Sequence, residues 1–247
     1  MSDDQTTAEN KAYFNSLAAK YDARFGPTLD KLLNEIRNRT DFIGADWVRE
    51  GEEDGRKVRL LDYACGTGLV SRALAPLTTQ CVGVDISEEM VNVYNSRAEM
   101  QGLSKDEMFA VNANLLDPAA PSPSALSSPL FFDFDVAAVG LGAHHFADPA
   151  FCATQLVQRL KPGGVLVFID FLTHEPAVAA GEEMAKGLNT VMHHGFSEEQ
   201  VRAFFEAAGA GKGFALQVMG RGMMFHGHGA GPEGSERLVF VARGEKA

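Results

Sequence analysis

The feature that most constrains this chain is the transition over residues 60–75, LLDYACGTGLVSRALA. An apolar run passes through small residues into a helical pattern, and one acid, Asp62, stands inside the run. Glycines at the end of a strand permit a sharp bend and a close approach of a ligand to the backbone. Free N–H groups at the start of the following helix favour a carboxylate or a phosphate. The segment therefore predicts a strand, a tight turn and a helix that open a ligand crevice.

Strands and helices alternate after this turn, because continuous apolar runs are separated by segments with three- and four-residue apolar spacing. The expected strands are 58–64, 81–85, 107–111, 134–140, 164–170, 213–219 and 237–243, and the expected helices are 69–76, 88–101, 149–160 and 197–208. This alternation indicates an α/β fold with a mostly parallel sheet and helices on both faces. A glycine-rich segment, not a helix, joins the last two strands, so we expect them to pair antiparallel at one edge.

The segment before the first strand has a helical pattern of its own. Apolar residues recur at one face of residues 11–25, and a second helical pattern runs from about Thr28 to Val48. We therefore expect residues 1–56 to form an N-terminal helical lid segment. Residues 57–247 then carry the ligand crevice, and the two parts belong to one structural domain.

Net charge, cysteine content and the lack of long apolar runs limit the expected partners and the expected cellular location. The formal net charge of −11 argues against affinity for phosphates, so we expect neither nucleic acid nor an anionic membrane as a partner. Cys65, Cys81 and Cys152 match neither a zinc motif nor a secreted disulfide framework. The polar N-terminus lacks the features of a signal peptide, and no apolar run reaches about 20 residues. We expect a cytoplasmic protein, with the nucleus left open, and the oligomeric state stays undetermined.

A second acid points to a nucleoside. Asp85 ends the next strand, where a carboxylate can accept both hydroxyl hydrogens of a ribose. The turn carries Gly66 and Gly68 but lacks the third glycine of the dinucleotide pattern, and Asp62 beside it would repel a pyrophosphate while suiting an ammonium group. These features favour S-adenosyl-L-methionine, whose methionine part carries an amino group. A nicotinamide-dependent oxidoreductase is the disfavoured alternative.

Five segments resemble, in order and spacing, those of the class I S-adenosylmethionine-dependent methyltransferases: LLDYACGTG, VGVDISEEMV, FDVAAVGLGAHHFADP, LKPGGVLVFIDF and GFSEEQVRAFFEAAG. The chain is most similar to the small-molecule group that includes the ubiquinone/menaquinone-biosynthesis C-methyltransferases, over roughly residues 11–243. The resemblance implies a seven-stranded Rossmann-like sheet of order 3-2-1-4-5-7-6 with strand 7 antiparallel. It also implies that residues 57–247 bind S-adenosylmethionine and that the methyl acceptor is a small molecule.

The resemblance further implies a set of cofactor-binding residues. The methionine end would meet Asp62, Ala64, Gly66, Gly68 and Val139, the ribose Asp85, and the adenine Ile86, Asn112 and Ala113, with Tyr21 closing over the cofactor. Two positions depart from the family pattern, because Ala64 replaces its first glycine and Asn112 replaces its usual acid. An Asn carbonyl can still accept a hydrogen bond from the adenine amino group.

Methyl transfer needs chiefly a positioned acceptor, and a base only where the acceptor must lose a proton. His144 is the candidate general base because it follows the fourth strand at the crevice, whereas we expect His145 to pack the turn. The N-terminal helices, residues 171–196 and residues 220–235 would build the acceptor pocket. The histidines, including His226 and His228, match no compact ligand motif, so we expect no metal. A non-catalytic or regulatory protein that binds the cofactor without methyl transfer is the alternative.

Overall fold

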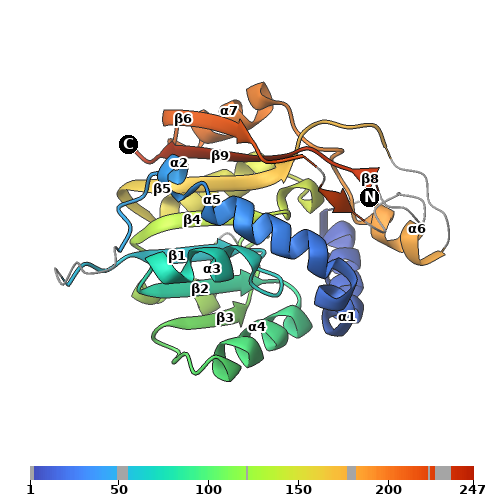
Figure 1. Cartoon of the computed structure of the whole chain (residues 1–247), viewed down its shortest axis with the longest axis horizontal. Helices are drawn as coiled ribbons and strands as arrows, with labels where there is room; N and C mark the ends of the chain where they lie inside the picture. Colours follow the sequence, from blue (N-terminus) through green and yellow to red (C-terminus); the bar gives the residue numbers. More distant parts are fainter. Residues whose placement is uncertain (1–2, 49–54, 121, 177–181, 222, 226–234) are drawn as a thin grey trace.

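Seven strands form the central sheet of the computed structural model, which describes residues 3–48, 55–120, 122–176, 182–221, 223–225 and 235–247. The strands are β1 (Arg59–Tyr63), β2 (Gln80–Asp85), β3 (Met108–Asn112), β4 (Phe134–Gly140), β5 (Leu160–Phe171), β6 (Lys212–Val218) and β9 (Val239–Glu245). Their order is β3-β2-β1-β4-β5-β9-β6 (Figure 1). Strands β1 to β5 pair in parallel, and β9 lies antiparallel between β5 and β6. The expected order, with the last strand of the sheet antiparallel, is confirmed.

Helices cover both faces of this sheet. They are α1 (Asp3–Arg37), α2 (Thr40–Ile43), α3 (Leu69–Leu74), α4 (Glu88–Met100), α5 (Pro149–Arg159), α6 (Glu182–Asn189) and α7 (Glu198–Ala207). Short 3-10 helices lie at Ala75–Leu77, Ser124–Leu126, Pro129–Phe131 and Ala143–His145. The short strands β7 (Met224–Phe225) and β8 (Ser235–Glu236) form a separate pair, which the sequence did not predict, and α6 was not expected either.

The side-chain alternation of the strands divides the core into two layers. In β4, Val136 and Ala138 pack with residues of α3, α4 and the second half of α1, whereas Ala137 and Val139 pack with residues of α5 and α7. Among the described residues, no helix combines the length and the apolarity needed to cross a bilayer.

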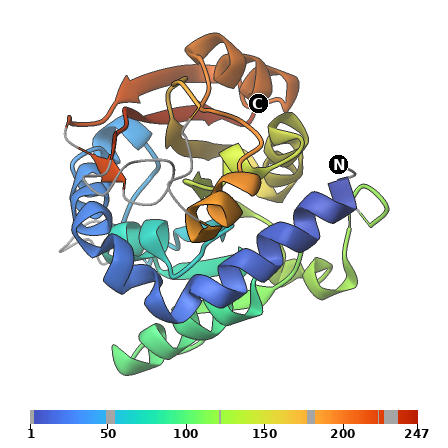
Figure 2. The same cartoon turned by 90° about the vertical axis from the view of Figure 1, so that its right-hand side faces the viewer.

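The division of the N-terminal segment into helices over 11–25 and 28–48 is wrong. One helix, α1, covers the first pattern and continues through Pro27 into the second as far as Arg37. The short α2 follows, and residues 45–48 are not helical. A proline removes one N–H and bends a helix, but tertiary packing can keep the helix continuous. Here Phe25 and Leu29 are buried on either side of Pro27. Figure 2 looks at the carboxyl ends of the parallel strands and shows α1 crossing in front of them, with α6 beside it.

Candidate functional site

A cavity of about 290 Å³ lies at the carboxyl ends of β1, β2 and β4, beneath α1. Its wall comes from the turn after β1, the end of β2, the segments after β3 and β4, and the first half of α1. Ligands bind in open α/β sheets outside the carboxyl ends of the strands, where neighbouring connections run in opposite directions. The cavity is therefore where the sequence predicted the crevice.

The glycine turn after β1 is held in the left-handed backbone region. Gly66 and Gly68 have φ of 51° and 92°, and Ala64 has φ of 52° although it carries a Cβ. A Cβ on Gly68 would lie 2.9 Å from Cδ2 of Tyr94, so the close packing of α4 requires glycine there. A Cβ on Gly66 would meet nothing within 4 Å, and Gly66 lines the cavity. The turn thus exposes the Gly66 backbone, without a side chain, to the cavity. The backbone of Ala64 is locally strained.

Asp85 is joined to this turn. Its Oδ2 accepts a 2.8 Å hydrogen bond from the Gly66 N–H, and its Oδ1 accepts one of 2.8 Å from the Ser87 N–H. Burial raises the pKa of Asp85 to about 6, and hydrogen bonds from the Ser87, Gly66 and Ile86 backbone oppose that rise. Each carboxylate oxygen accepts two hydrogen bonds, so acceptor sites remain for a ligand diol. Asp85 and Ile86 both line the cavity.

Asp62 lies behind the turn, outside the cavity wall. It is 1% exposed, and its Oδ2 accepts hydrogen bonds from the Ser71 N–H at 3.0 Å and the Ser71 hydroxyl at 2.7 Å. Burial raises the pKa of Asp62 to about 7, the two Ser71 bonds oppose this, and the nearby charge of Asp85 adds to it. Asp62 therefore holds the start of α3 against the turn.

The expected cofactor-binding residues divide into two groups. Tyr21, Ala64, Gly66, Asp85 and Ile86 line the cavity, whereas Asp62, Gly68, Asn112, Ala113 and Val139 do not. Asn112 is exposed and donates from Nδ2 to the Asp85 carbonyl at 2.9 Å, and Val139 is fully buried in the core. Asn114 and Gly140, close behind them in the chain, take the wall positions. Direct cofactor contact by the second group stays a prediction.

Side chains of α1 that the sequence reasoning missed close the cavity. Thr6, Thr7, Asn10 and Phe14 line it. Asn15 Oδ1 accepts hydrogen bonds from the Ser87 hydroxyl at 2.7 Å and the Glu89 N–H at 3.3 Å. Thr7, Asn10 and Phe14 recur at three- and four-residue steps, so they share one face of a helix, and this spacing was the available signal.

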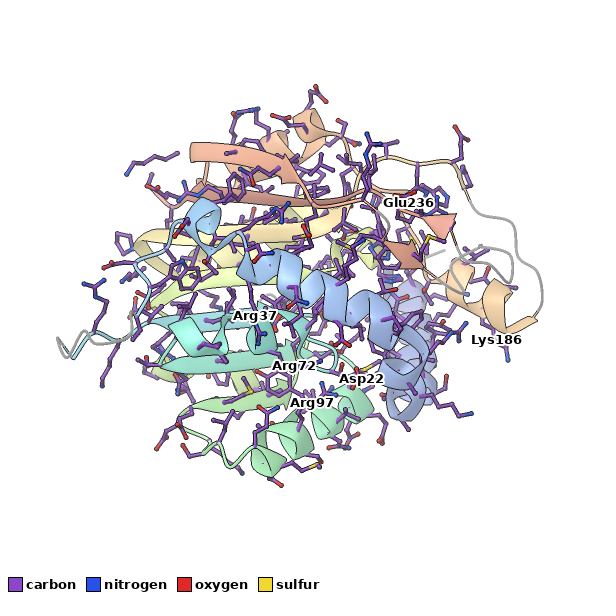
Figure 3. All side chains as sticks on the ribbon, viewed as in Figure 1. Asp22, Arg37, Arg72, Arg97, Lys186 and Glu236 are labelled. Atoms are coloured by element: carbon purple, nitrogen blue, oxygen red, sulfur yellow. The ribbon has the colours of Figure 1, made fainter. Side chains whose placement is uncertain are left out.

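Farther along α1, Asp22 makes a second attachment. Its Oδ1 accepts a 2.8 Å hydrogen bond from the Thr67 hydroxyl, and its Oδ2 forms an ion pair with Arg97 of α4. Arg97 also donates to the Thr67 carbonyl. Figure 3 shows Asp22 and Arg97 close together where α1 passes α4. Together with Asn15, these contacts fix α1 to the turns that follow β1 and β2.

A second pocket of about 30 Å³ shares Phe14, Tyr21 and His145 with the first and adds His144. Its other rings belong to Phe25, Phe171 and Phe225. The pocket is thus narrow, aromatic and directly beside the larger cavity. Of the expected acceptor segment 220–235, residues 222 and 226–234, with His226 and His228, lie outside the described residues.

His144 is paired with an acid that the sequence reasoning missed. Its Nδ1 lies 2.7 Å from Asp170 Oδ1, and its backbone N–H donates to Asp170 Oδ2 at 3.1 Å. Asp170 is fully buried at the end of β5, and an acid inside the run GVLVFIDF was the signal for it. An aspartate facing Nδ1 keeps a proton on that nitrogen and leaves the ring's basic lone pair on Nε2. His145 Nδ1 lies 2.8 Å from the Thr190 carbonyl, in keeping with a packing role.

The wall residues fit an adenosyl cofactor. Asp85 offers acceptors for a ribose diol, Gly66 offers bare backbone, and Ile86 offers an apolar contact for a base. The volume suits a nucleoside-sized ligand. Among the described residues, no group of three or more His, Cys, Asp or Glu side chains is arranged to hold a metal ion.

Known proteins share this sequence pattern and fold. A family model for a methyltransferase domain matches residues 61–166. An uncharacterized methyltransferase, C1347.09, of Schizosaccharomyces pombe is 31% identical over 182 residues, which cover 72% of this chain and 60% of that protein. A ubiquinone biosynthesis O-methyltransferase of Leptothrix cholodnii is 30% identical over 192 residues, which cover 74% of this chain and 72% of that one. This chain therefore spans less than two thirds of the length of the Schizosaccharomyces pombe relative.

The fold likeness extends beyond the matched segment. The crystal structure of the YcgJ protein from Bacillus subtilis matches 86% of this chain and 98% of its own, with a TM-score of 0.59 and 19% identity. At this identity the likeness concerns the fold alone.

Proposed function

Because this chain belongs to the class I S-adenosylmethionine-dependent methyltransferases, we propose that it methylates a small or medium-sized organic acceptor. The observation that carries the proposal is the cavity wall that unites Asp85 with the Gly66 turn, beside a second pocket that contains His144. In this proposal the larger cavity binds the cofactor, and the smaller pocket beside it binds the methyl acceptor.

Residues of the larger cavity hold the cofactor in this proposal. The Asp85 carboxylate accepts the ribose hydroxyls, the backbone at Gly66 lies against the methionine part, and Ile86 packs on the adenine. Tyr21 closes over the cofactor from α1. Asp62 and Gly68 do not line the cavity but hold the glycine turn in place. Residues at the ends of β3 and β4 support the cavity walls, namely Asn112, Ala113 and Val139.

His144 accepts the proton of an acceptor that must be deprotonated, and Asp170 orients its ring. The bound cofactor supplies an electrophilic methyl carbon, so that in-line attack forms the acceptor–methyl bond, breaks the methyl–sulfur bond and releases S-adenosylhomocysteine. The aromatic rings around His144 favour a flat or apolar acceptor. At about 30 Å³ this pocket is too small for most organic acceptors, so α1 must shift for entry.

Residues 1–56 act as the lid segment and 57–247 as the cofactor-binding domain in this proposal. The buried, unpaired Cys65, Cys81 and Cys152 suit a reducing compartment such as the cytoplasm. The net charge of −11 favours a small-molecule acceptor over a nucleic acid.

Label transfer tests the proposal. The protein is incubated with methyl-labelled S-adenosylmethionine and a metabolite extract, and the extract is separated by chromatography. We expect labelled small molecules with the wild-type protein, and about tenfold less label with Asp85→Ala when the cofactor is well below saturation. Label in protein or nucleic acid alone would contradict a small-molecule acceptor, and cofactor binding without any labelled product would contradict catalysis.

A further inference from the structure

Asn10 of α1 carries a buried acceptor with no partner among the described residues. The residue is 6% exposed and lines the larger cavity. Its Nδ2 donates a 3.1 Å hydrogen bond to the His145 carbonyl, whereas its Oδ1 is buried without a hydrogen-bond partner. Buried polar atoms in native proteins are nearly always hydrogen-bonded, so this oxygen needs an explanation.

The orientation of the Asn10 amide is fixed by chemistry. A carbonyl oxygen can only accept, so the amide nitrogen must be the atom that faces His145. Rotating the amide would place two acceptors against each other and would leave the nitrogen without its partner. Asn10 therefore offers its oxygen, and only a hydrogen-bond donor can satisfy that oxygen.

We infer that Asn10 Oδ1 accepts a hydrogen bond from an N–H group of the bound cofactor, an inference that rests on the proposed function. The same cavity is lined by Gly66 and Asp85, so the cofactor is the molecule that fills it. Asp85 has acceptor sites for the hydroxyl groups, which leaves the N–H donors, namely the adenine amino group and the ammonium of the methionine part. Either donor would tie the first turns of α1 to the cofactor.

Binding of three probes to wild type and Asn10→Leu tests the inference by isothermal titration. S-adenosylhomocysteine carries both donors, 5′-methylthioadenosine lacks the ammonium, and the S-adenosylhomocysteine analogue with hydrogen in place of the adenine amino group lacks the other donor. Asn34→Leu is the matched control, because Asn34 lies exposed on α1 outside this cavity. Thermal unfolding without ligand checks that each variant folds.

We expect Asn10→Leu to weaken S-adenosylhomocysteine binding about tenfold, while Asn34→Leu binds as wild type does. The loss should disappear with one probe, and that probe identifies the donor that Asn10 binds. Affinity of Asn10→Leu for S-adenosylhomocysteine within twofold of wild type would overturn the inference. An equal loss of affinity for all three probes would also overturn it, because it would mean that the substitution displaces α1. Failure of the wild-type protein to bind any probe would instead contradict the proposed function.

Discussion

The hydroxyl of Thr67 donates a 2.8 Å hydrogen bond to Asp22 Oδ1, and this contact joins α1 to the glycine turn that lines the larger cavity. The two residues are 45 positions apart in the chain. Arg97 of α4 binds both of them, so α1, the glycine turn and α4 meet at this point. In this arrangement α1 covers the cavity. We therefore expect that release of α1 controls exchange of the cofactor.

Removing the Asp22 attachment should accelerate that release. Asp22→Ala breaks the Thr67 hydrogen bond and the Arg97 ion pair, which are partly exposed and together contribute about 1 kcal/mol. We expect S-adenosylhomocysteine to dissociate about fivefold faster, as measured by stopped-flow fluorescence. Glu198→Ala, which breaks the exposed Glu198–Arg202 pair on α7, is the control and should leave the rate unchanged. Equal rates in both variants would mean that α1 does not gate exchange.

The strained Ala64 backbone predicts a stabilising substitution. At φ of 52° an L-residue with a Cβ is disfavoured by about 1–2 kcal/mol, and part of this is offset by the greater chain entropy of glycine in the unfolded state. Ala64→Gly should raise the free energy of unfolding by about 0.5–1 kcal/mol in urea titration. Ala203→Gly, on the exposed face of α7, is the control, and it should lower the free energy of unfolding by about 1 kcal/mol. A loss of stability in Ala64→Gly would contradict the strain.

Asp62 makes the stability of the protein pH-dependent in a defined direction. Its folded pKa of about 7 lies above the unfolded value, so its stabilising contribution is present at low pH and is lost as the pH rises through about 7. Asp62→Asn cannot ionise, and its oxygen can still accept from Ser71. The free energy of unfolding of the variant relative to wild type should therefore increase from pH 5 to pH 8. A pH-independent difference between Asp62→Asn and wild type would refute this account.

His144 should affect turnover without affecting cofactor binding. His144→Ala removes the proposed base and should lower the turnover number about 100-fold or more with the acceptor identified by label transfer. Its affinity for S-adenosylhomocysteine should stay within twofold of wild type, because His144 lines only the smaller pocket. Asp170→Asn should shift the pH profile of turnover. Unchanged turnover in His144→Ala would show that the acceptor needs no base from this residue.

The sheet and the floor of the site were predictable because their signals are local. The glycine turn and Asp85 follow directly from apolar runs that end in small or acidic residues, and the strand order follows from the family resemblance. The lid contacts were not predictable. Asn10 and His145 are 135 positions apart, and Asn15 and Ser87 are 72 apart, so only tertiary packing brings them together.

The same limit explains one correction in the N-terminal segment and one prediction that stays open at the strand ends. Pro27 favours a break, but burial of Phe25 and Leu29 around it keeps α1 continuous. The family resemblance predicts that Asn112 and Val139 contact the cofactor, and this stays a prediction, because neither residue lines the cavity whereas Asn114 and Gly140 do. A shift of one or two residues at a strand end changes which side chain reaches the cavity, and sequence patterns do not define strand ends that closely.

Titration of S-adenosylhomocysteine into wild type and Asp85→Ala at pH 7.5 tests most directly the claim that Asp85 binds the ribose in this cavity. The account predicts micromolar affinity for wild type and at least a tenfold loss in the variant, about 1.4 kcal/mol, with Asp106→Ala binding as wild type. Because the pKa of Asp85 is about 6 and its ionised form binds the diol, wild-type affinity should also fall below pH 6. Equal affinity of Asp85→Ala and wild type would contradict the account.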